Sequence, residues 1–158
     1  WRRSFMRFKR GFSALLLAVA VVALDRATKH WAMRALAQPV VAIEGVLRWR
    51  YCENTGAAFS ALSGSGTVVL VLSAVLLAVL AAYLLFRPRI PWGAQLCLWA
   101  VVAGGASNLF DRLAWGFVVD FIEPLFVSFA VFNVADCFIV LGVLGAALTV
   151  LLDREGAK

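Results

Sequence analysis

Two aspartates, Asp120 and Asp136, lie near the ends of a mostly apolar stretch, VDFIEPLFVSFAVFNVAD, at residues 119–136. Asp136 opens the last long apolar run, and a carboxylate at the edge of a membrane span is costly enough to indicate a function. Two carboxylates that meet do not both ionise easily, so they share a proton. The ionised member then takes a proton from water while the other protonates a leaving amine. The pair predicts peptide hydrolysis without a nucleophilic serine or cysteine and without a metal.

The other residues of interest, all polar except for one glycine, fall where apolar runs end or in the segments between them. They are Asp25, Lys29, Asn54, Gly56, Asn108, Asp111, Arg112 and Asn133. Scattered structural residues would not converge in this way, so the pattern favours a site. A structural interpretation stays open for each: Asn54 and Gly56 suit an ordinary turn, and Asp111 with Arg112 suits a pair at the membrane interface.

Two further spacings have both a structural and a functional interpretation. Asp25 and Lys29 are four residues apart, which is the spacing of an ion pair on one helix face. Asn133 and Asp136 are three residues apart, which is the spacing of a helix N-terminal cap. Both spacings are also compatible with residues of a site.

Cysteine and histidine usage excludes several kinds of site. The three cysteines, Cys52, Cys97 and Cys137, are odd in number and form no disulfide framework. Their spacing matches no metal site. His30 is the only histidine, so a His-rich metal site is excluded and a Ser-His-Asp arrangement would depend on that residue alone. We expect neither a metal nor a cofactor.

The elements that must position these residues are membrane helices. The chain is 63% hydrophobic, with a mean hydropathy of +0.90, which exceeds the range of soluble proteins. Its basic residues flank apolar runs, so the net charge of +6 does not indicate nucleic-acid binding. The apolar runs predict a single membrane-embedded domain over residues 1–158. Its four spans are expected at about residues 12–33, 67–86, 92–110 and 134–152.

The first run has an alternative. Its basic start, its apolar middle and the small residues at 35–37 also suit a cleaved signal peptide. Three further apolar runs favour a retained helix instead. Within the third run, the small residues at 104–107 predict close helix packing.

A different pattern occupies about residues 38–62, which we expect to be an extracytoplasmic hairpin region. Residues 40–51 alternate around a tight turn at Glu44-Gly45. One face of the hairpin carries Arg48 and Arg50, and the other carries Leu47, Trp49 and Tyr51. We expect a small sheet lying on the membrane, with its aromatic face toward lipid or protein.

The charge distribution predicts an orientation. Four spans put both termini on one side, and nine of the 15 Lys and Arg residues then lie there against six on the other side. This bias predicts cytoplasmic termini. Seven of the nine acidic residues map to the outer side or its membrane edge, so the polar clusters are expected to face outward.

Five segments match, in order and spacing, motifs of a known family. They are residues 25–29 (DRATK), 54–60 (NTGAAFS), 108–112 (NLFDR), 119–122 (VDFI) and 132–136 (FNVAD). The chain thus resembles the lipoprotein signal peptidases, the signal peptidase II family of bacterial membrane aspartyl proteases, over nearly its whole length. It departs from the pattern at Ser107, where the family commonly has glycine.

The resemblance implies an all-α membrane protein, with four transmembrane helices, a small extracytoplasmic β-cradle and a further loop or helix over the active site. It implies an aspartic endopeptidase of the bacterial cytoplasmic (inner) membrane. The enzyme would remove signal peptides from prolipoproteins, before a diacylglyceryl-modified cysteine at the outer surface. The expected partners are those substrates and membrane lipid, with no nucleic acid, and the chain is expected to be a monomer.

The resemblance also distributes roles among the candidate residues. Asp120 and Asp136 match the catalytic pair. The positions that match substrate-binding or supporting residues are Asn54, Gly56, Asn108, Arg112 and Asn133. Those that match the family's polar frame are Asp25, Lys29 and Asp111.

Two other functions compete with this one. A proton-coupled transporter also uses intramembrane carboxylates, but it should place them near the midplane and often has repeated halves. No repeat is visible in the sequence. A non-enzymatic membrane assembly factor would use the sheet for docking and would not need both Asp120 and Asp136.

Overall fold

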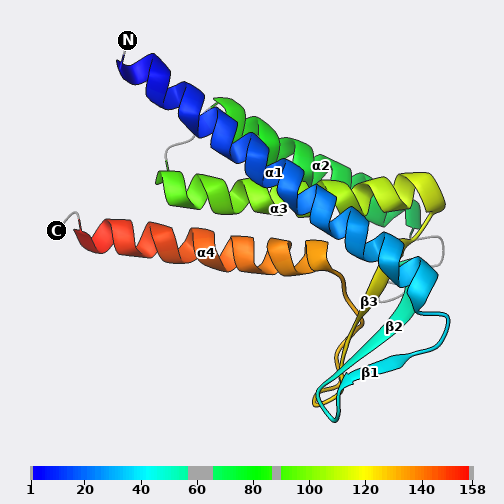
Figure 1. Ribbon diagram of the computed structural model, residues 1–158. Helices are drawn as coiled ribbons and strands as arrows, with labels where there is room; N and C mark the ends of the chain where they lie inside the picture. Colours follow the sequence, from blue (N-terminus) through cyan, green and yellow to red (C-terminus); the bar gives the residue numbers. More distant parts are fainter. Residues whose placement is uncertain (1, 57–65, 87–89, 157–158) are drawn as a thin grey trace.

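The computed structural model describes residues 2–56, 66–86 and 90–156. Within them, four long helices run side by side and a small sheet lies at one end of the bundle (Figure 1). The elements in chain order are α1 (Arg2–Ala35), β1 (Val40–Ile43), β2 (Leu47–Asn54), α2 (Gly66–Phe86), α3 (Trp92–Trp115), β3 (Val118–Pro124) and α4 (Val134–Gly156). The start of α1 and the end of α4 lie opposite the sheet. The expected fold class, four apolar helices with a small sheet, is confirmed.

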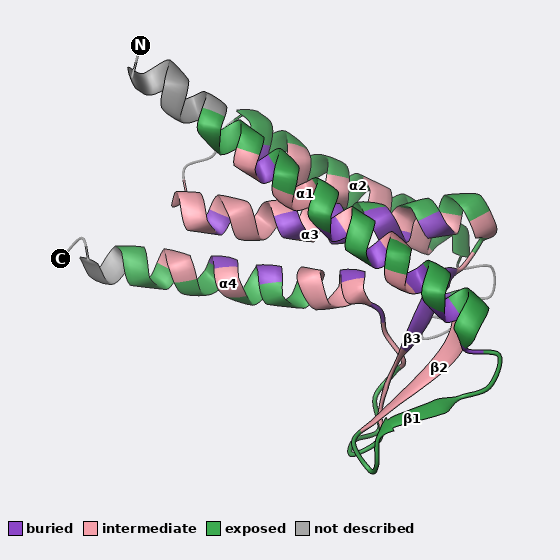
Figure 2. Cartoon of the chain, viewed as in Figure 1, coloured by how far each residue is buried: buried purple, intermediate pink, exposed green. Residues whose placement is uncertain are grey.

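Each helix contains a stretch that is long and apolar enough to cross a membrane: Lys9–Ala35, Gly66–Phe86, Trp92–Trp115 and Val134–Asp153. The protein is therefore a multi-pass membrane protein. The helices cover the four predicted ranges, and α3 continues past residue 110, which puts Asp111 inside a helix. Figure 2 shows that the outward faces of the helices are largely exposed, and Leu76 of α2 is 68% exposed. In the membrane, these apolar faces would be covered by lipid.

Helix α3 is the centre of the bundle, since it packs against α1, α2 and α4. A Cβ added at Gly104 would lie 2.7 Å from the main-chain oxygen of Ala135, so only glycine permits the observed approach of α3 and α4. This contact confirms the close packing predicted for residues 104–107. Buried apolar residues also lie between α1 and α3, among them Val21 of α1 and Ala103 of α3.

The sheet is antiparallel, with the order β1-β2-β3. β1 and β2 form the hairpin expected around Glu44-Gly45. Residues 57–65, which include the end of the predicted hairpin region and most of the NTGAAFS motif, lie outside the described residues. β3 was not predicted as a strand, although its β-branched run VVDFI, bounded by Gly116 and Pro124, is a strand signal.

The two faces of the hairpin differ as their alternation predicts. Trp49 packs against Trp31 of α1 and Phe121 of β3, with ring centroids 5.8 and 6.1 Å apart. The aromatic face thus lies on protein, where it covers the buried side chains of Ala32 and Val119. This contact fixes the sheet to the end of α1.

The opposite face of the sheet carries an ion-pair cluster. The Nε atoms of Arg48 and Arg50 lie 2.6 and 3.1 Å from the same carboxylate oxygen of Glu123. The hydrogen bond from Arg48 holds the pKa of Glu123 below its usual range. These contacts link β2 and β3, farther along the same strand pair than Asp120.

Candidate active site

A set of buried polar side chains lies between the helices and β3, at the sheet end of the bundle (Figure 2). Its members are Asp25, Lys29, Ser107, Asn108, Asp111, Asp120 and Asn133. The half-buried Arg26 and Asp136 lie beside them. We call Asp120 and Asp136 the dyad, and Asp25, Arg26, Lys29 and Asp111 the ion-pair frame; the remaining members contact one or both groups.

Asp120 lies on β3 opposite Cys52 of β2, and it is 2% exposed. Its carboxylate is held by two neutral amides. Asn54 Nδ2 donates to Oδ2 at 2.8 Å, and Asn133 Nδ2 donates to Oδ1 at 2.7 Å. Burial raises the pKa of Asp120 to about 6, and the nearby Asp136 carboxylate contributes in the same direction, against these amide hydrogen bonds. The Asp120 carboxyl therefore binds its proton more tightly than an exposed aspartate does, and it titrates closer to neutral pH.

Asp136 lies in the first turn of α4, where it forms a reciprocal cap with Asn133. The Asp136 main-chain N–H donates to Asn133 Oδ1 at 2.9 Å, and the Asn133 main-chain N–H donates to Asp136 Oδ2 at 3.2 Å. The cap that the spacing predicted therefore forms. Asn133 also contacts Asp120, so one residue holds both carboxylates of the dyad.

Asn108 of α3 connects the dyad to the frame. Its Nδ2 donates to Asp136 Oδ1 at 2.8 Å. Its Oδ1 accepts from Asn133 Nδ2 at 3.1 Å and from Lys29 Nζ at 2.7 Å. Because two donors converge on Oδ1, the amide is fixed with its N–H groups toward Asp136.

Lys29 is fully buried and has three close partners. Its Nζ lies 2.8 Å from Asp25 Oδ2, 2.7 Å from Asp111 Oδ2 and 2.7 Å from Asn108 Oδ1. An ammonium group has three N–H donors, so this set matches its full capacity. The i,i+4 pair with Asp25 forms as its spacing predicts, and it is part of a larger cluster.

Arg26, which was not among the predicted site residues, completes the frame. Its Nη2 contacts Asp111 Oδ1 and lies 3.5 Å from Asp25 Oδ2. Its guanidinium carbon lies 5.3 Å from the ring centroid of Phe110 and 5.5 Å from that of Trp115. The two rings shield this cation at the membrane edge. No local signal distinguished Arg26 from the other basic residues.

Ser107, where the chain departs from the family pattern, contacts the frame directly. Its hydroxyl donates to Asp25 Oδ2 at 2.6 Å. The other oxygen of Asp25 accepts the main-chain N–H of Ala135 at 2.9 Å. Asp25 thus joins α1 to α3 and α4, and the serine adds one hydrogen bond to that junction.

Gly56 orients Asn54. Its φ of +83° suits glycine, and its N–H donates to Asn54 Oδ1 at 2.8 Å. With Oδ1 engaged in this way, Asn54 directs Nδ2 to Asp120. The turn chemistry that the sequence indicated is present, and it positions a dyad contact.

Arg112 lies at the border of the site. Its Nη1 is 3.4 Å from the main-chain oxygen of Asn108, one turn earlier in α3. Among the described residues, Asp111 pairs with Arg26 and Lys29, so the expected pair between Asp111 and Arg112 does not form. The Arg112 side chain is half-buried.

The arrangement is suited to proton transfer. Two carboxylates share a neighbour and are held by amides, whereas the cations are occupied in the frame. Within residues 2–56, 66–86 and 90–156, no group of three or more His, Cys, Asp or Glu side chains is placed to hold a metal ion.

Comparison with known proteins gives a consistent result. A sequence model of the family Signal peptidase (SPase) II matches residues 17–152. The chain is similar to a lipoprotein signal peptidase of Xylella fastidiosa (strain M12), with 39% identity over 149 residues and 89% of each chain covered. It is 33% identical over 141 residues to a lipoprotein signal peptidase of Streptococcus thermophilus (strain CNRZ 1066), covering 88% of this chain and 92% of that one. A solved bacterial membrane enzyme, determined by the in meso method at 1.9 Å, has a TM-score of 0.79 and 28% identity, and covers 86% of this chain and 90% of its own.

Proposed function

Because this chain belongs to the signal peptidase II family, we propose that Asp120 and Asp136 are the acid/base pair with which it cleaves its substrates. The protein removes signal peptides from prolipoproteins, and it is a protease. Membership of this family rules out the transporter and the assembly factor that the sequence left as alternatives. The aspartic mechanism and the roles of the individual residues are the proposal.

The contact of Asn133 with both carboxylates is the observation that carries this assignment. The main-chain N–H of Asn133 donates to the Asp136 carboxylate and its side-chain amide donates to the Asp120 carboxylate, so the two carboxylates share this neighbour. Neighbouring carboxylates favour the state in which one is protonated and one is ionised. That state supplies a general base and a general acid together.

The proposed reaction needs only water and the dyad. The ionised carboxylate takes a proton from a water molecule as its oxygen attacks the scissile carbonyl carbon. The tetrahedral intermediate then collapses, the C–N bond breaks, and the other carboxyl gives its proton to the leaving amine. The dyad ends with one proton, as it began.

The surrounding residues have different proposed tasks. Asn54 is half-buried and Arg112 lies at the border, so both are suited to bind the substrate peptide. Asn108 is buried and its amide oxygen has two donors, which suits a positioning role toward Asp136. Gly56 supports Asn54 through its hydrogen bond.

We further propose that the dyad faces the outside of the cytoplasmic membrane and that both termini are cytoplasmic. The excess of Lys and Arg on the side of the termini supports this orientation. A signal helix of about 20 residues spans the bilayer, so its cleavage site reaches the outer surface, where the dyad would lie. Cleavage before a diacylglyceryl-modified cysteine, by a monomeric single-domain enzyme in contact with lipid, completes the proposal.

Fusions test the orientation. A cytoplasm-active reporter placed after Lys158 should be active, and one placed after Glu44 in the β1–β2 turn should be inactive. The opposite result would put the dyad on the wrong side of the membrane for the substrate.

A cleavage assay tests the catalytic class. The purified protein should cut a diacylglyceryl-modified precursor peptide in detergent micelles, and added hydroxylamine should yield no hydroxamate of the signal peptide. A serine or cysteine protease forms an acyl-enzyme that hydroxylamine intercepts. A hydroxamate product would therefore contradict the dyad mechanism.

Lipid modification is the second part of the assay. The same peptide with an unmodified cysteine should be cleaved far more slowly when both peptides are embedded in the same bilayer, because fit of the acyl chains positions the scissile bond. Equal rates would show that the enzyme reads only the peptide.

A further inference from the structure

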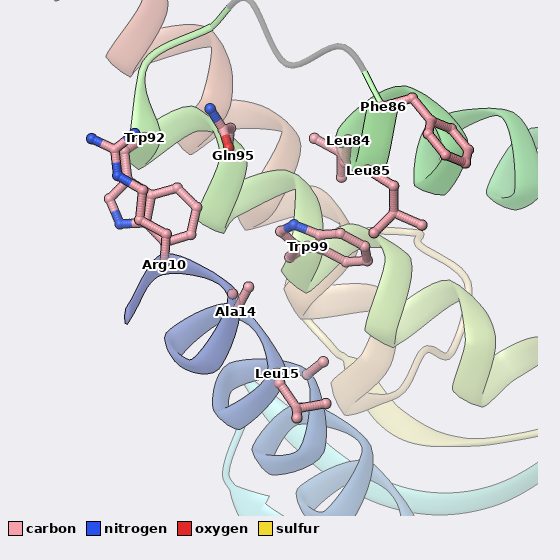
Figure 3. A pocket seen from close by; sticks show the side chains of 11 residues that line it. Arg10, Ala14, Leu15, Leu84, Leu85, Phe86, Trp92, Gln95 and Trp99 are labelled. Carbon is pink, nitrogen blue, oxygen red and sulfur yellow. The ribbon is translucent and has the colours of Figure 1, made fainter. Parts of the chain in front are cut away.

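A cavity of about 750 Å³ lies at the end of the bundle opposite the dyad. It is lined by the first half of α1, the end of α2 and the start of α3 (Figure 3). None of its lining residues belongs to the dyad or the ion-pair frame. Its size is within the range of small-molecule binding sites.

The lining changes character along its length. Arg10 and Gln95 are polar, and the guanidinium of Arg10 lies over the ring of Trp92, 5.5 Å from its centroid. Figure 3 shows this stacked pair at one end and Trp99 beyond it, toward α2. A stacked guanidinium keeps its N–H groups for hydrogen bonds in its own plane.

The apolar remainder of the cavity lies deeper in the helices. Ala14 and Leu15 of α1 face Leu84 of α2 and Trp99 of α3 across it. From Arg10 to Ala14, α1 rises by about 6 Å, at about 1.5 Å per residue. The cavity therefore has a cationic mouth and an apolar interior.

The mouth lies at the depth of a membrane interface. Three of the four candidate spans have an end there, because α1 enters at Lys9, α2 ends at Phe86 and α3 begins at Trp92. Tryptophan and arginine are typical of the headgroup level, where an amphipathic ring and a cation both have polar partners.

We propose that this cavity binds an anionic membrane phospholipid, with an acyl chain among the apolar residues and the headgroup phosphate paired with Arg10. An arginine guanidinium matches phosphate geometry. Arg2, Arg3, Arg7 and Lys9 also precede Arg10 in the sequence, and a basic segment at a membrane surface attracts anionic lipid.

Charge complementarity separates this occupant from the substrate. A signal peptide begins with a positively charged segment. Such a segment would be repelled by Arg10 and by the basic residues before it, whereas an anionic headgroup is attracted. The lipid site is thus separate from the proposed cleavage site, and lipid binding can be measured without measuring cleavage.

Native mass spectrometry of the full chain in detergent tests the proposal. The probe is an equimolar mixture of dioleoyl phosphatidylglycerol and dioleoyl phosphatidylcholine. The wild-type protein should retain the anionic lipid about fivefold more than the zwitterionic one, as a single exposed ion pair permits. Arg10→Gln should bring the ratio close to one.

A matched control removes the same charge at the other end of the same helix. Arg34→Gln, in the last turn of α1, should keep the wild-type ratio. Equal retention of both lipids by the wild type, an unchanged ratio in Arg10→Gln, or an equal loss in both variants would overturn the proposal.

Gly11→Phe tests the cavity itself. A Cβ at Gly11 meets no heavy atom within 4 Å, so a larger side chain enters open space at a lining position. This variant should retain less of both lipids while its thermal midpoint and cleavage rate stay at the wild-type values. Undiminished lipid retention by this variant would overturn the proposal. The proposal would also fail if the wild-type protein formed a dimer that Gly11→Phe abolishes, because a second copy of the chain would then occupy the cavity.

Discussion

Two pairs of aspartates lie within one connected network of this protein, and they are held in opposite ways. Asp25 and Asp111 of the ion-pair frame are fully buried and contact two cations, Lys29 and Arg26. The frame therefore has as many positive as negative charges. In the dyad, the hydrogen bonds to the carboxylates come from asparagine side chains and main-chain N–H groups.

The difference in hydrogen-bond partners distinguishes carboxylates suited to a structural role from carboxylates suited to proton transfer. A buried carboxylate beside a cation is stabilised in its ionised form and does not exchange protons readily. A buried carboxylate beside neutral amides has a raised pKa, as for Asp120, where it is about 6. In the proposed mechanism, the sheet and α4 thus provide the proton-transfer groups, while α1 and α3 provide charge balance.

The largest expected effect comes from neutralising the dyad. Asp120→Asn and Asp136→Asn should each lower kcat by about 10³-fold or more, because each removes one half of the acid/base pair. Both variants should remain folded in detergent, with intact charge balance in the frame. Cleavage of a lipid-modified precursor and thermal unfolding measure the two properties separately. Substantial turnover by either variant would end the assignment of the dyad.

The frame should respond in the opposite way. Lys29→Met leaves two buried carboxylates with Arg26 alone, and it should lower the free energy of unfolding by about 3–5 kcal/mol. It also removes one of the two donors to Asn108 Oδ1, so cleavage should fall together with stability. Thermal unfolding in detergent, followed by circular dichroism, measures the loss.

A double variant provides the matched control. Lys29→Met combined with Asp111→Asn removes one charge of each sign, so it should be more stable than Lys29→Met alone. A double variant as unstable as the sum of the single ones would show that charge balance is not what the frame contributes.

The raised pKa of Asp120 makes a smaller, pH-dependent prediction. The folded pKa of about 6 exceeds the ordinary value of 3.8, so the stabilising contribution is complete below pH 3.8 and is lost as the pH rises through about 6. Asp120→Asn does not titrate. Relative to the wild type, it should therefore gain roughly 2 kcal/mol between about pH 4 and about pH 8. Parallel melting profiles for the two proteins across this range would contradict the shift.

The smallest effect is expected on the outer face of the sheet, where Glu123 is paired but not deeply buried. Arg48→Gln should shift the thermal midpoint only slightly, and less at high salt, because exposed ion pairs are weak and screened. The lowered pKa of Glu123 means that its contribution is present above its ordinary value of 4.5 and is lost as the pH falls below it. A large, salt-insensitive loss would show that burial is not what distinguishes the frame.

Much of this arrangement follows from local sequence. Hydropathy indicates the four helices, and alternation indicates the β1–β2 hairpin with its two different faces. The spacing of Asn133 and Asp136 predicts the cap, and that of Asp25 and Lys29 predicts the ion pair. Each of these depends on residues within a few positions of one another, which a linear pattern records directly.

Contacts between distant segments were not predictable in the same way. Ser107 and Asp25 are 82 positions apart, and their hydrogen bond depends on how α1 packs against α3. The role of Arg26 depends on three residues of α3, namely Asp111 and the aromatic rings of Phe110 and Trp115. β3 carried a usable signal, but its short apolar run was also compatible with the edge of a membrane span.

The ion pair within α1 also affects how the chain enters the membrane during synthesis. Asp25 and Lys29 of α1 leave the ribosome before Asn108 and Asp111 of α3, which follow about 80 residues later. A lone charge in an inserting helix is costly, at about 2.5–3.5 kcal/mol on the translocon scale for the helix centre and less toward the end of the span, where Asp25 and Lys29 lie. Asp25 and Lys29 lie one turn apart, with Nζ 2.8 Å from Oδ2, so the nascent helix brings its own counter-charge into the lipid, and the partners on α3 are added to this pair when that helix arrives.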